Sequence, residues 1–292
     1  MTYPVVAGVP ILINERRSPF RIADYLPQTN PSTGSRLIHL LAAGVDALPS
    51  LSRNVGSREN FHALAALMRD RGPRAGHTNR FRILVVGGAS VGVGSQGLLE
   101  EPDVDVIETD IVRTARTQIV CDAHDLPFAT GAFDVVICQA VLEHVLDPVR
   151  VVSEIHRVLA DDGLVYSEIP FMQQVHGGRY DVTRFTLLGH RRLYRCFDEV
   201  RSGAQGGPGM ALAWSLWYFM RALAPGRIGR GLAVVLARIL FFWLKYIDDF
   251  IVEKPAAIDA ASGTFFMGRR RIDAVNDAEI LASYRGAGAS AT

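Results

Sequence analysis

Short apolar runs alternate with amphipathic stretches through the middle of the chain. Runs of this length, rich in β-branched residues and ending at polar or turn-forming residues, are typical of buried strands. Five of them lie at 81–86 (FRILVV), 104–110 (VDVIETD), 117–123 (TQIVCDA), 132–139 (AFDVVICQ) and 164–170 (LVYSEIP), and a last strand is expected at 263–271 (GTFFMGRRR). Strands that alternate with helices predict a parallel α/β sheet with right-handed crossovers.

Two helices carry start and stop signals. The segment 57–72 has Ser57 as its candidate cap and ends at a glycine before a proline. The segment 147–163 has Asp147 as cap, Pro148 at the first position and a glycine stop. Further helices are expected at 36–48 and 95–100, and a loop at 27–35. Residues 3–13 alternate and contain two prolines, which predicts a short hairpin or edge element.

Residues 210–251 are strongly apolar. Arg221 and Pro225 interrupt the first half, and Arg238 and Lys245 the second, so neither half has the roughly 20 uninterrupted apolar residues of a spanning helix. Helices that bury one face fit better. Such helices would serve as a lid over an acceptor pocket, a homodimer face or a peripheral membrane contact, and plain core or lid packing needs no special function.

Composition narrows the class of protein. The chain has 292 residues, a formal net charge of +1 and 49% hydrophobic residues. This charge gives no support to a nucleic-acid partner. The three cysteines are far apart, which argues against a disulfide framework or a cysteine zinc site, and we expect no metal. No signal-peptide pattern is seen at the N-terminus, so a cytoplasmic location, peripheral to the inner face of the membrane if residues 210–251 bind lipid, is expected.

The glycines after the first parallel strand raise the question of a ligand. Gly92, Gly94 and Gly97 spell a literal G-x-G-x-x-G, which would suggest a nicotinamide dinucleotide. However, ligands bind beyond the carboxyl ends of strands, and the strand ends near residue 86. Gly87 and Gly88 are therefore the residues expected to form the tight turn, with Ala89 and Gly92 completing the loop.

Polar residues follow the next strands. Asp110 ends the second strand, where a carboxylate can accept ribose hydroxyls, although Asp105 and Glu108 are rivals. Asp122 and Ala123 follow the third strand, in place to meet an adenine. Residues 139–144, which begin with Gln139, lie at the carboxyl end of the fourth strand, where cofactor and substrate would meet.

The run from 81 to 170 resembles class I S-adenosylmethionine-dependent methyltransferases of the methyltransferase type 11-like subgroup. The resemblance rests on the pattern D-x-x-x-L-P-F, F-D-x-V, L-E-H and on the helix and strand of 152–170. It implies a Rossmann-like, doubly wound, mostly parallel seven-stranded sheet and S-adenosyl-L-methionine as cofactor. It assigns the cofactor to Gly87, Gly88, Ala89, Gly92, Asp110, Asp122, Ala123 and Gln139, and matches Cys138, Glu143 and His144 to the fourth motif. The chain departs from the family at Val85, where an acid is common, and at Ala89.

Residues 169–197 resemble a segment of methyltransferases associated with glycan and cell-surface biosynthesis, which implies a small-molecule, glycan or lipid-linked acceptor. His176, Asp181, Arg184 and Thr186 occupy its pattern. Residues 3–15 resemble the end of a Trm112-type domain without its zinc cysteines. The implied organisation is an N-terminal extension over 1–78, a cofactor-binding core over 79–205, an apolar helical insertion over 206–255, a last core strand within 256–275 and a flexible tail over 276–292.

Methyl transfer to oxygen needs alignment of the reactants and a base for the hydroxyl proton. His176 is the first candidate base and His144 the second, against the alternatives of a backbone-bonded loop histidine and of packing under the cofactor. Asp181 and Arg184 are spaced to pair with each other, or to clamp an acidic acceptor. The principal functional alternative is a degenerate cofactor-binding scaffold without turnover, motivated by Val85, Ala89 and the long glycine loop; a nicotinamide dehydrogenase leaves the L-P-F and L-E-H motifs unexplained.

Overall fold

The computed structural model describes residues 2–26, 47–73 and 79–291 of the chain. The loop expected at 27–35 and most of the helix expected at 36–48 lie outside these ranges. The strands are β1 Val5–Val6, β2 Val9–Leu12, β3 Phe81–Val86, β4 Val104–Asp110, β5 Ile119–Cys121, β6 Phe133–Gln139, β7 Leu159–Pro170, β8 Phe197–Gly206 and β9 Gly263–Arg270. The helices are α2 Ser57–Arg71, α3 Gln96–Leu99, α4 Pro148–Val158, α5 Leu187–Leu193, α6 Pro208–Leu223, α7 Gly226–Phe241, α8 Leu244–Ile251, α9 Pro255–Ile258 and α10 Asp277–Ala282, with 3-10 turns η1 Ile22–Tyr25, η2 Leu142–His144, η3 Gly178–Tyr180 and η4 Ala287–Ala291.

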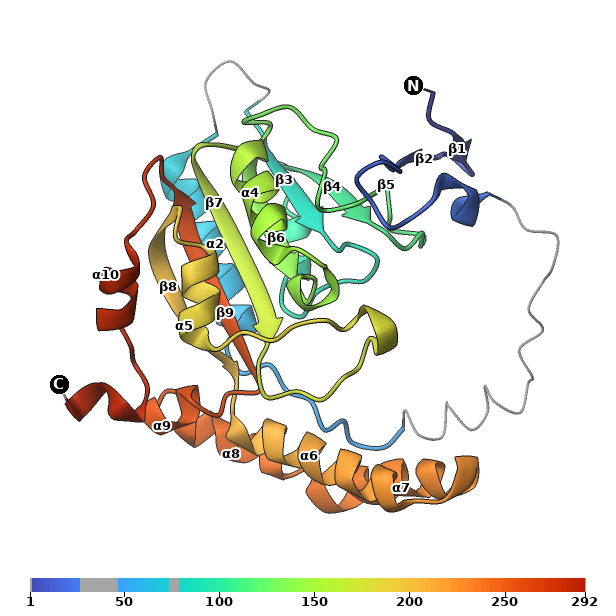
Figure 1. Ribbon diagram of the computed structural model, residues 1–292. Helices are drawn as coiled ribbons and strands as arrows, with labels where there is room; N and C mark the ends of the chain where they lie inside the picture. Colours follow the sequence, from blue (N-terminus) through green and yellow to red (C-terminus); the bar gives the residue numbers. More distant parts are fainter. Residues whose placement is uncertain (1, 27–46, 74–78, 292) are drawn as a thin grey trace.

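Within the described ranges, nine strands form one sheet in the order β1-β2-β5-β4-β3-β6-β7-β9-β8 (Figure 1). The strands from β2 to β7 pair in parallel, whereas β1, β9 and β8 are joined through antiparallel pairs. The strand order reverses between β3 and β6, as in Rossmann-like folds. The expectation of seven strands is wrong, because the N-terminal hairpin β1–β2 adds two strands beside β5.

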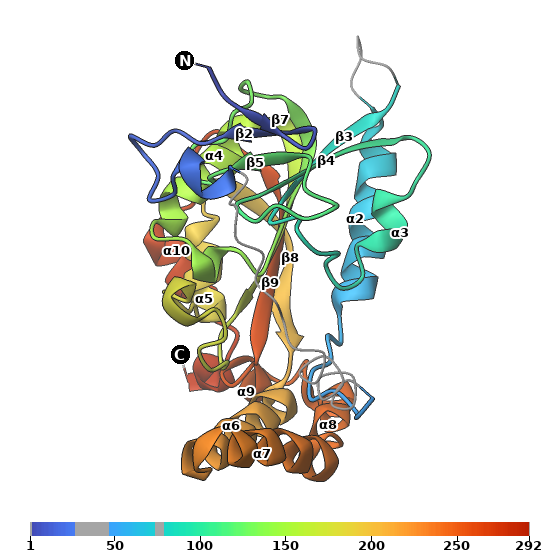
Figure 2. The ribbon, with the colours of Figure 1, turned by 90° about the vertical axis from the view of Figure 1, so that its right-hand side faces the viewer.

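Helices cover both faces of the sheet (Figure 2). Alternate residues of β3 enter the two cores: Leu84 and Val86 pack in the cluster that includes α4, while Ile83 and Val85 pack with α2. Strand β3 is thus buried on both sides, which explains its continuous apolar sequence.

The two helices with sequence signals form with altered ends. Asp147 caps α4 as expected, since its side chain accepts the Arg150 N–H, but α4 ends at Val158 and the chain passes directly into β7. Ser57 is not the cap of α2; Gly56 holds that position. The Ser57 hydroxyl is directed instead to Glu168, a contact described below.

Helices α6, α7 and α8 lie beyond the end of the sheet at which β7 and β8 terminate (Figures 1 and 2). They pack on one another through small residues such as Ala213 and Ala237. Within the described ranges, no helix has the length and apolar content needed to cross a membrane.

The segment expected as a flexible tail, 276–292, begins with a short helix. Helix α10 forms there, capped by the Asn276 side chain. Tyr284 and the Ala287 N–H then both bind the carboxylate of Asp259, which ties the segment to α9.

Candidate functional site

A pocket of about 310 Å³ opens at the carboxyl ends of β3, β4 and β6, and is called the main pocket below. This is the place where open parallel sheets bind ligands. Strands, the glycine loop after β3, the loop after β7 and helix α6 all contribute to its wall. Its lining includes Val85, Val86, Gly87, Ser90, Val91, Gly92, Val93, Glu108, Gln139, Ala140, Glu143, Glu168, Gln173, His176, Gln205, Met210 and Trp214.

The turn that follows β3 depends on glycine. Gly87 has a φ of +81°, and a Cβ there would stand 2.2 Å from Cγ2 of Val141. The N–H groups of Gly87 and Gly88 both donate to Thr109 O at 2.9 Å, which holds the turn against β4. A side chain at residue 87 would therefore be strained and would displace the η2 region.

The remaining glycines of the loop have separate tasks. A Cβ on Gly92 would lie 1.9 Å from Oε1 of Gln139, so glycine leaves room for that amide in the pocket. Gly94 lies against the backbone at the start of α2, and Gly97 is in α3 with open space around it. The literal G-x-G-x-x-G thus does not form the turn at the strand end.

Two acids of β4 stand near the pocket in different ways. Each oxygen of Asp110 accepts one backbone N–H, from Ala89 at 3.0 Å and from Val112 at 2.7 Å. Asp110 does not line the main pocket, whereas Glu108 does and is paired with Arg116. Asp110 thus shapes the glycine loop, and a second lone pair on each of its oxygens could accept a ribose hydroxyl.

Asp122 and Ala123 lie away from the main pocket. Asp122 is buried and accepts hydrogen bonds from Ser18 and from both the N–H and the ring of His124. Burial alone would raise the pKa of Asp122, but these donors hold it below its ordinary value. Asp122 therefore joins the N-terminal segment to the core, and Ala123 packs against the apolar core.

A buried carboxylate network that the sequence did not suggest borders the pocket. Glu168 accepts the hydroxyls of Ser57 at 2.8 Å and Tyr166 at 2.5 Å on one oxygen. Its other oxygen accepts the amides of Gln139 at 3.1 Å and Gln205 at 3.2 Å. Burial raises the pKa of Glu168, and the hydrogen bonds from Tyr166, Gln139 and Ser57 oppose that rise. The network fixes Gln139 at the end of β6.

A second buried carboxylate of the main pocket, Glu143, lies beside two histidines. Nε2 of His144 and Nε2 of His176 each lie 3.7 Å from Glu143 Oε1, and the two rings meet edge to face at 5.0 Å. Burial raises the pKa of Glu143 to about 7, with Arg184 partly offsetting it. Burial also lowers the pKa of His176, against the attraction of Asp181. His176 lines the main pocket and His144 does not.

Asp181 and Arg184 form the ion pair that their spacing suggests. The hydrogen bonds from Arg184 hold the pKa of Asp181 well below its ordinary value. The other Arg184 N–H groups donate to the carbonyls of Gln173, Gln174 and Thr183. With the two bonds to Asp181, this accounts for all five guanidinium N–H groups, so Arg184 has none left to clamp a substrate.

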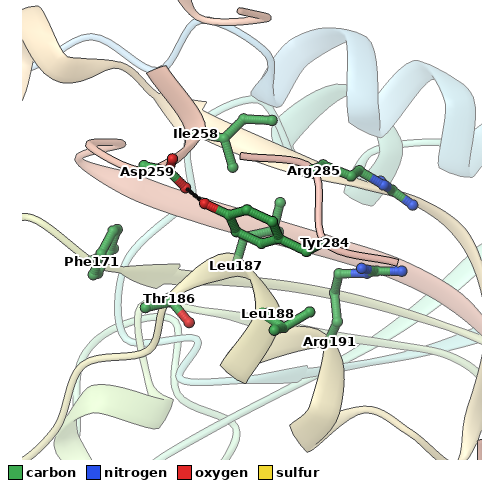
Figure 3. A pocket seen from close by; sticks show the side chains of 9 residues that line it. All are labelled: Phe171, Thr186, Leu187, Leu188, Arg191, Ile258, Asp259, Tyr284 and Arg285. Carbon is green, nitrogen blue, oxygen red and sulfur yellow. Dashed lines mark hydrogen bonds between the residues drawn. The ribbon is translucent and has the colours of Figure 1, made fainter. Parts of the chain in front are cut away.

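A second pocket of about 210 Å³ lies between α5, α9 and the C-terminal segment (Figure 3). Its charged and phenolic groups already have partners: Tyr284 donates to Asp259 at 2.6 Å, and Arg191 and Arg285 both pair with Glu199. This pocket has no unpaired chemical group among the residues described, so the main pocket is the candidate site.

Residues 91–167 match the model of a family described as a methyltransferase domain, about a quarter of the chain. No curated protein matches the sequence. Among solved structures, the chain is similar to Haemonchus contortus phosphoethanolamine N-methyltransferase 2 bound to phosphomonomethylethanolamine and S-adenosylhomocysteine (17% identity, TM-score 0.46, 80% of this chain and 57% of that chain). It is also similar to the [4+2]-cyclase SpnF (16% identity, TM-score 0.43, 81% of this chain and 93% of that chain). A third similar structure is an S-adenosylmethionine-dependent methyltransferase of Methanosarcina mazei (14% identity, TM-score 0.39, 66% of this chain and 94% of that chain).

Proposed function

We propose that this chain is an S-adenosylmethionine-dependent methyltransferase that transfers a methyl group to oxygen on a small-molecule, glycan or lipid-linked acceptor. The observation that carries the proposal is the glycine turn at Gly87, at the carboxyl end of β3, in the segment next to the matched methyltransferase domain. The turn, the main pocket and the strand-order reversal coincide, as expected of a nucleotide-like ligand site.

The residues present fit this cofactor. The pocket volume of about 310 Å³ lies at the lower end of the range for small-molecule sites. Gly87, Gly92 and Gln139 would hold the cofactor in the main pocket, with Gly88 and Ala89 supporting the loop and Asp110 or Glu108 receiving the ribose. When bound, the cofactor supplies a methyl group activated on a sulfonium sulfur. The chain's own contribution is to orient the acceptor and to exclude water, which can supply much of the rate.

The acceptor end of the pocket suits a molecule with hydroxyl groups. Glu143, Gln173 and His176 are polar, and Trp214 of α6 adds a broad apolar ring. An aromatic face beside hydrogen-bonding groups favours a sugar-like or polyol acceptor over a purely apolar one. The hydroxyl must lose a proton during transfer, and Nε2 of His176 is the pocket-lining imidazole nitrogen that could take it.

Titration calorimetry with S-adenosylmethionine and S-adenosylhomocysteine tests the proposal. We expect binding to the wild-type chain. Comparison of Asp110→Asn with Glu108→Gln then decides which acid contacts the ribose. Only the variant that lacks this acid should bind S-adenosylmethionine more weakly than the wild type. The absence of binding heat would overturn the proposal. Binding without transfer of labelled methyl to any member of a hydroxylated acceptor library would favour the scaffold alternative.

We also propose that α6, α7 and α8 contact a membrane surface. Each presents one exposed apolar stripe at helical spacing: Leu212, Phe219 and Leu223; Ile228, Leu232, Leu236, Ile239 and Leu240; and Trp243, Tyr246, Ile247 and Phe250. Exposed arginines at 221, 227 and 230 flank these stripes. Apolar stripes beside cations are typical of helices that lie on anionic lipid. A lipid-linked acceptor would then reach the pocket beside Met210 and Trp214 of α6.

The subgroup and the Trm112-like origin of the N-terminal segment remain predictions. What supports the second is the small hairpin β1–β2, which attaches to the edge of the sheet beside β5. Ser18, in the segment that follows this hairpin, donates a hydrogen bond to Asp122 and so attaches the N-terminal segment to the core.

A further inference from the structure

We propose that Glu143, His144 and His176 form a site for a divalent transition-metal ion of the zinc type at the acceptor end of the main pocket. One ligand atom from each residue lies within 4.8 Å of the others, and both Glu143–histidine distances are 3.7 Å. In a tetrahedral site with bonds of about 2.0–2.1 Å, neighbouring ligand atoms are about 3.4 Å apart. Small side-chain movements would therefore complete the coordination. Two imidazoles and one carboxylate favour zinc-like ions over Mg²⁺ or Ca²⁺.

The outer ring nitrogens of both histidines have partners of the kind that orient metal ligands. Nδ1 of His144 lies 3.0 Å from Tyr180 O, and Nδ1 of His176 lies 3.2 Å from Oδ2 of Asp181. A guanidinium nitrogen of Arg184 lies 3.5 Å from the same His176 nitrogen, farther away than the Asp181 oxygen, so the carboxylate is the closer partner of Nδ1. With the protons on Nδ1, both Nε2 lone pairs face the cluster. A carbonyl and a carboxylate behind ligating histidines are the usual second layer of a metal site.

Glu143 supplies an independent observation that calls for a cation. Its side chain has no exposed surface, and neither carboxylate oxygen has a hydrogen-bond partner among the residues described. At 3.7 Å the two histidines are too far for hydrogen bonds. Glu168, which borders the same pocket, has four donors. A buried carboxylate without partners is costly, and a bound cation would remove that cost.

The chain holds the cluster in place through the loop after β7. The N–H groups of Val182 and Thr183 donate to Glu143 O at 2.8 and 3.3 Å. A Cβ on Gly177 would stand 2.6 Å from Cε1 of His144, so the loop approaches that ring only because residue 177 is glycine. The Asp181–Arg184 pair closes the loop and adds no net charge. The residues are thus arranged before any ion binds.

Three protein ligands leave a coordination position open, as in catalytic zinc sites. Glu143 and His176 line the main pocket, so that position faces the acceptor. A metal ion lowers the pKa of a bound hydroxyl. It would then replace His176 as the group that activates the acceptor, since the Nε2 lone pair would be used for coordination, and the hydroxyl proton would leave to solvent water as the oxygen–methyl bond forms. This catalytic role rests on the proposed function, whereas the metal site itself does not.

The test is metal binding to the full chain after dialysis against a chelator, without cofactor or acceptor. Co²⁺ is titrated and followed by its visible d–d absorption, and Zn²⁺ by calorimetry. We expect one ion per chain. His144→Ala and Glu143→Gln should abolish binding, Asp181→Asn should weaken it about 10- to 100-fold, and the exposed His62→Ala on α2 should change nothing.

The outcomes are separable. Circular dichroism shows whether a variant is folded. If the substitution of the buried Glu143 prevents folding, His144→Ala decides the test, because the side chain of His144 is partly exposed. Stoichiometric binding that His144→Ala leaves unchanged, or no binding at micromolar metal to the wild type, would overturn the proposal. Loss of metal with unchanged S-adenosylmethionine binding separates this site from the cofactor site, and metal binding by a chain that fails to bind cofactor would leave this inference standing.

Discussion

Gly87 and Val141 are in such close contact that residue 87 has room for a hydrogen atom and nothing more: a Cβ would stand 2.2 Å from Val141 Cγ2. The positive φ of Gly87 adds a second reason for glycine. These two residues join the loop after β3 to the η2 turn, so they set the shape of the main pocket.

Gly87→Ala should therefore weaken S-adenosylmethionine binding at least 10-fold and lower the free energy of unfolding by about 1–3 kcal/mol, because strain and overlap coincide. Calorimetry and urea denaturation measure the two effects. Gly97→Ala is the matched control, since Gly97 lies in α3 with nothing near its Cβ position. Alanine there should be neutral or stabilise by up to about 1 kcal/mol. Equal losses in both variants would show that the literal triplet matters after all.

Ser57→Ala removes one of the two hydroxyl donors on Glu168 Oε1. The carboxylate is buried, so we expect a loss of about 1–3 kcal/mol in the free energy of unfolding. Urea denaturation measures it. Ser153→Ala on α4, whose hydroxyl bonds to Val149 O within the same helix, is the control and should change stability by less than about 0.5 kcal/mol. A neutral Ser57→Ala would contradict the idea that this hydroxyl is needed to stabilise the buried carboxyl group of Glu168.

His190 should make the fold sensitive to acid. It is fully buried between Ser167 and Thr264, and burial lowers its pKa to about 3. An unfolded histidine binds a proton below about pH 6.5, whereas the folded one stays neutral. The unfolded state therefore binds more protons between these values, and stability falls as the pH falls, by about 1.4 kcal/mol per unit.

Denaturation of the wild type and of His190→Gln at several pH values checks this. The difference in their free energies of unfolding should be constant above about pH 7 and should shrink as the pH falls toward 4.5. A difference that does not change with pH would show that folding leaves the pKa of His190 at its ordinary value.

Vesicle flotation tests the membrane surface. The wild type should float with vesicles that contain anionic lipid and much less with neutral ones. Ile228→Ser with Phe250→Ser should abolish flotation, because these side chains are 84% and 82% exposed on α7 and α8. Ile272→Ser changes a residue that is 92% exposed outside these helices and should have no effect. If the wild type does not float and sediments as a dimer in analytical ultracentrifugation, the exposed apolar stripes would instead be the contact surface for a second copy of the chain.

The sequence alone determined the parallel part of the sheet and the position of the glycine turn after β3. Strands β3 and β6 and the second half of β7 are nearly continuous apolar runs because they are buried on both faces, and burial of that kind can be recognised from neighbouring residues. The place of Gly87 followed from the same reasoning, since a turn must come directly after a strand. Strand β8 was missed because its residues FDEVRSGAQG have neither alternation nor an apolar run.

Only the tertiary structure decided which polar residues meet. Ser57 and Glu168 are 111 residues apart in the sequence. Glu143 lies after β6, whereas His176 lies after β7. No local periodicity of the sequence could therefore predict these contacts. The same holds for Asp122, which the resemblance placed at the cofactor and which accepts the Ser18 hydroxyl. It also holds for Arg184, the candidate clamp for an acidic acceptor, whose N–H groups donate to Asp181 and to backbone carbonyls of its own loop. Local sequence encodes burial and turns, whereas hydrogen bonding between distant segments depends on how the sheet and loops bring them together.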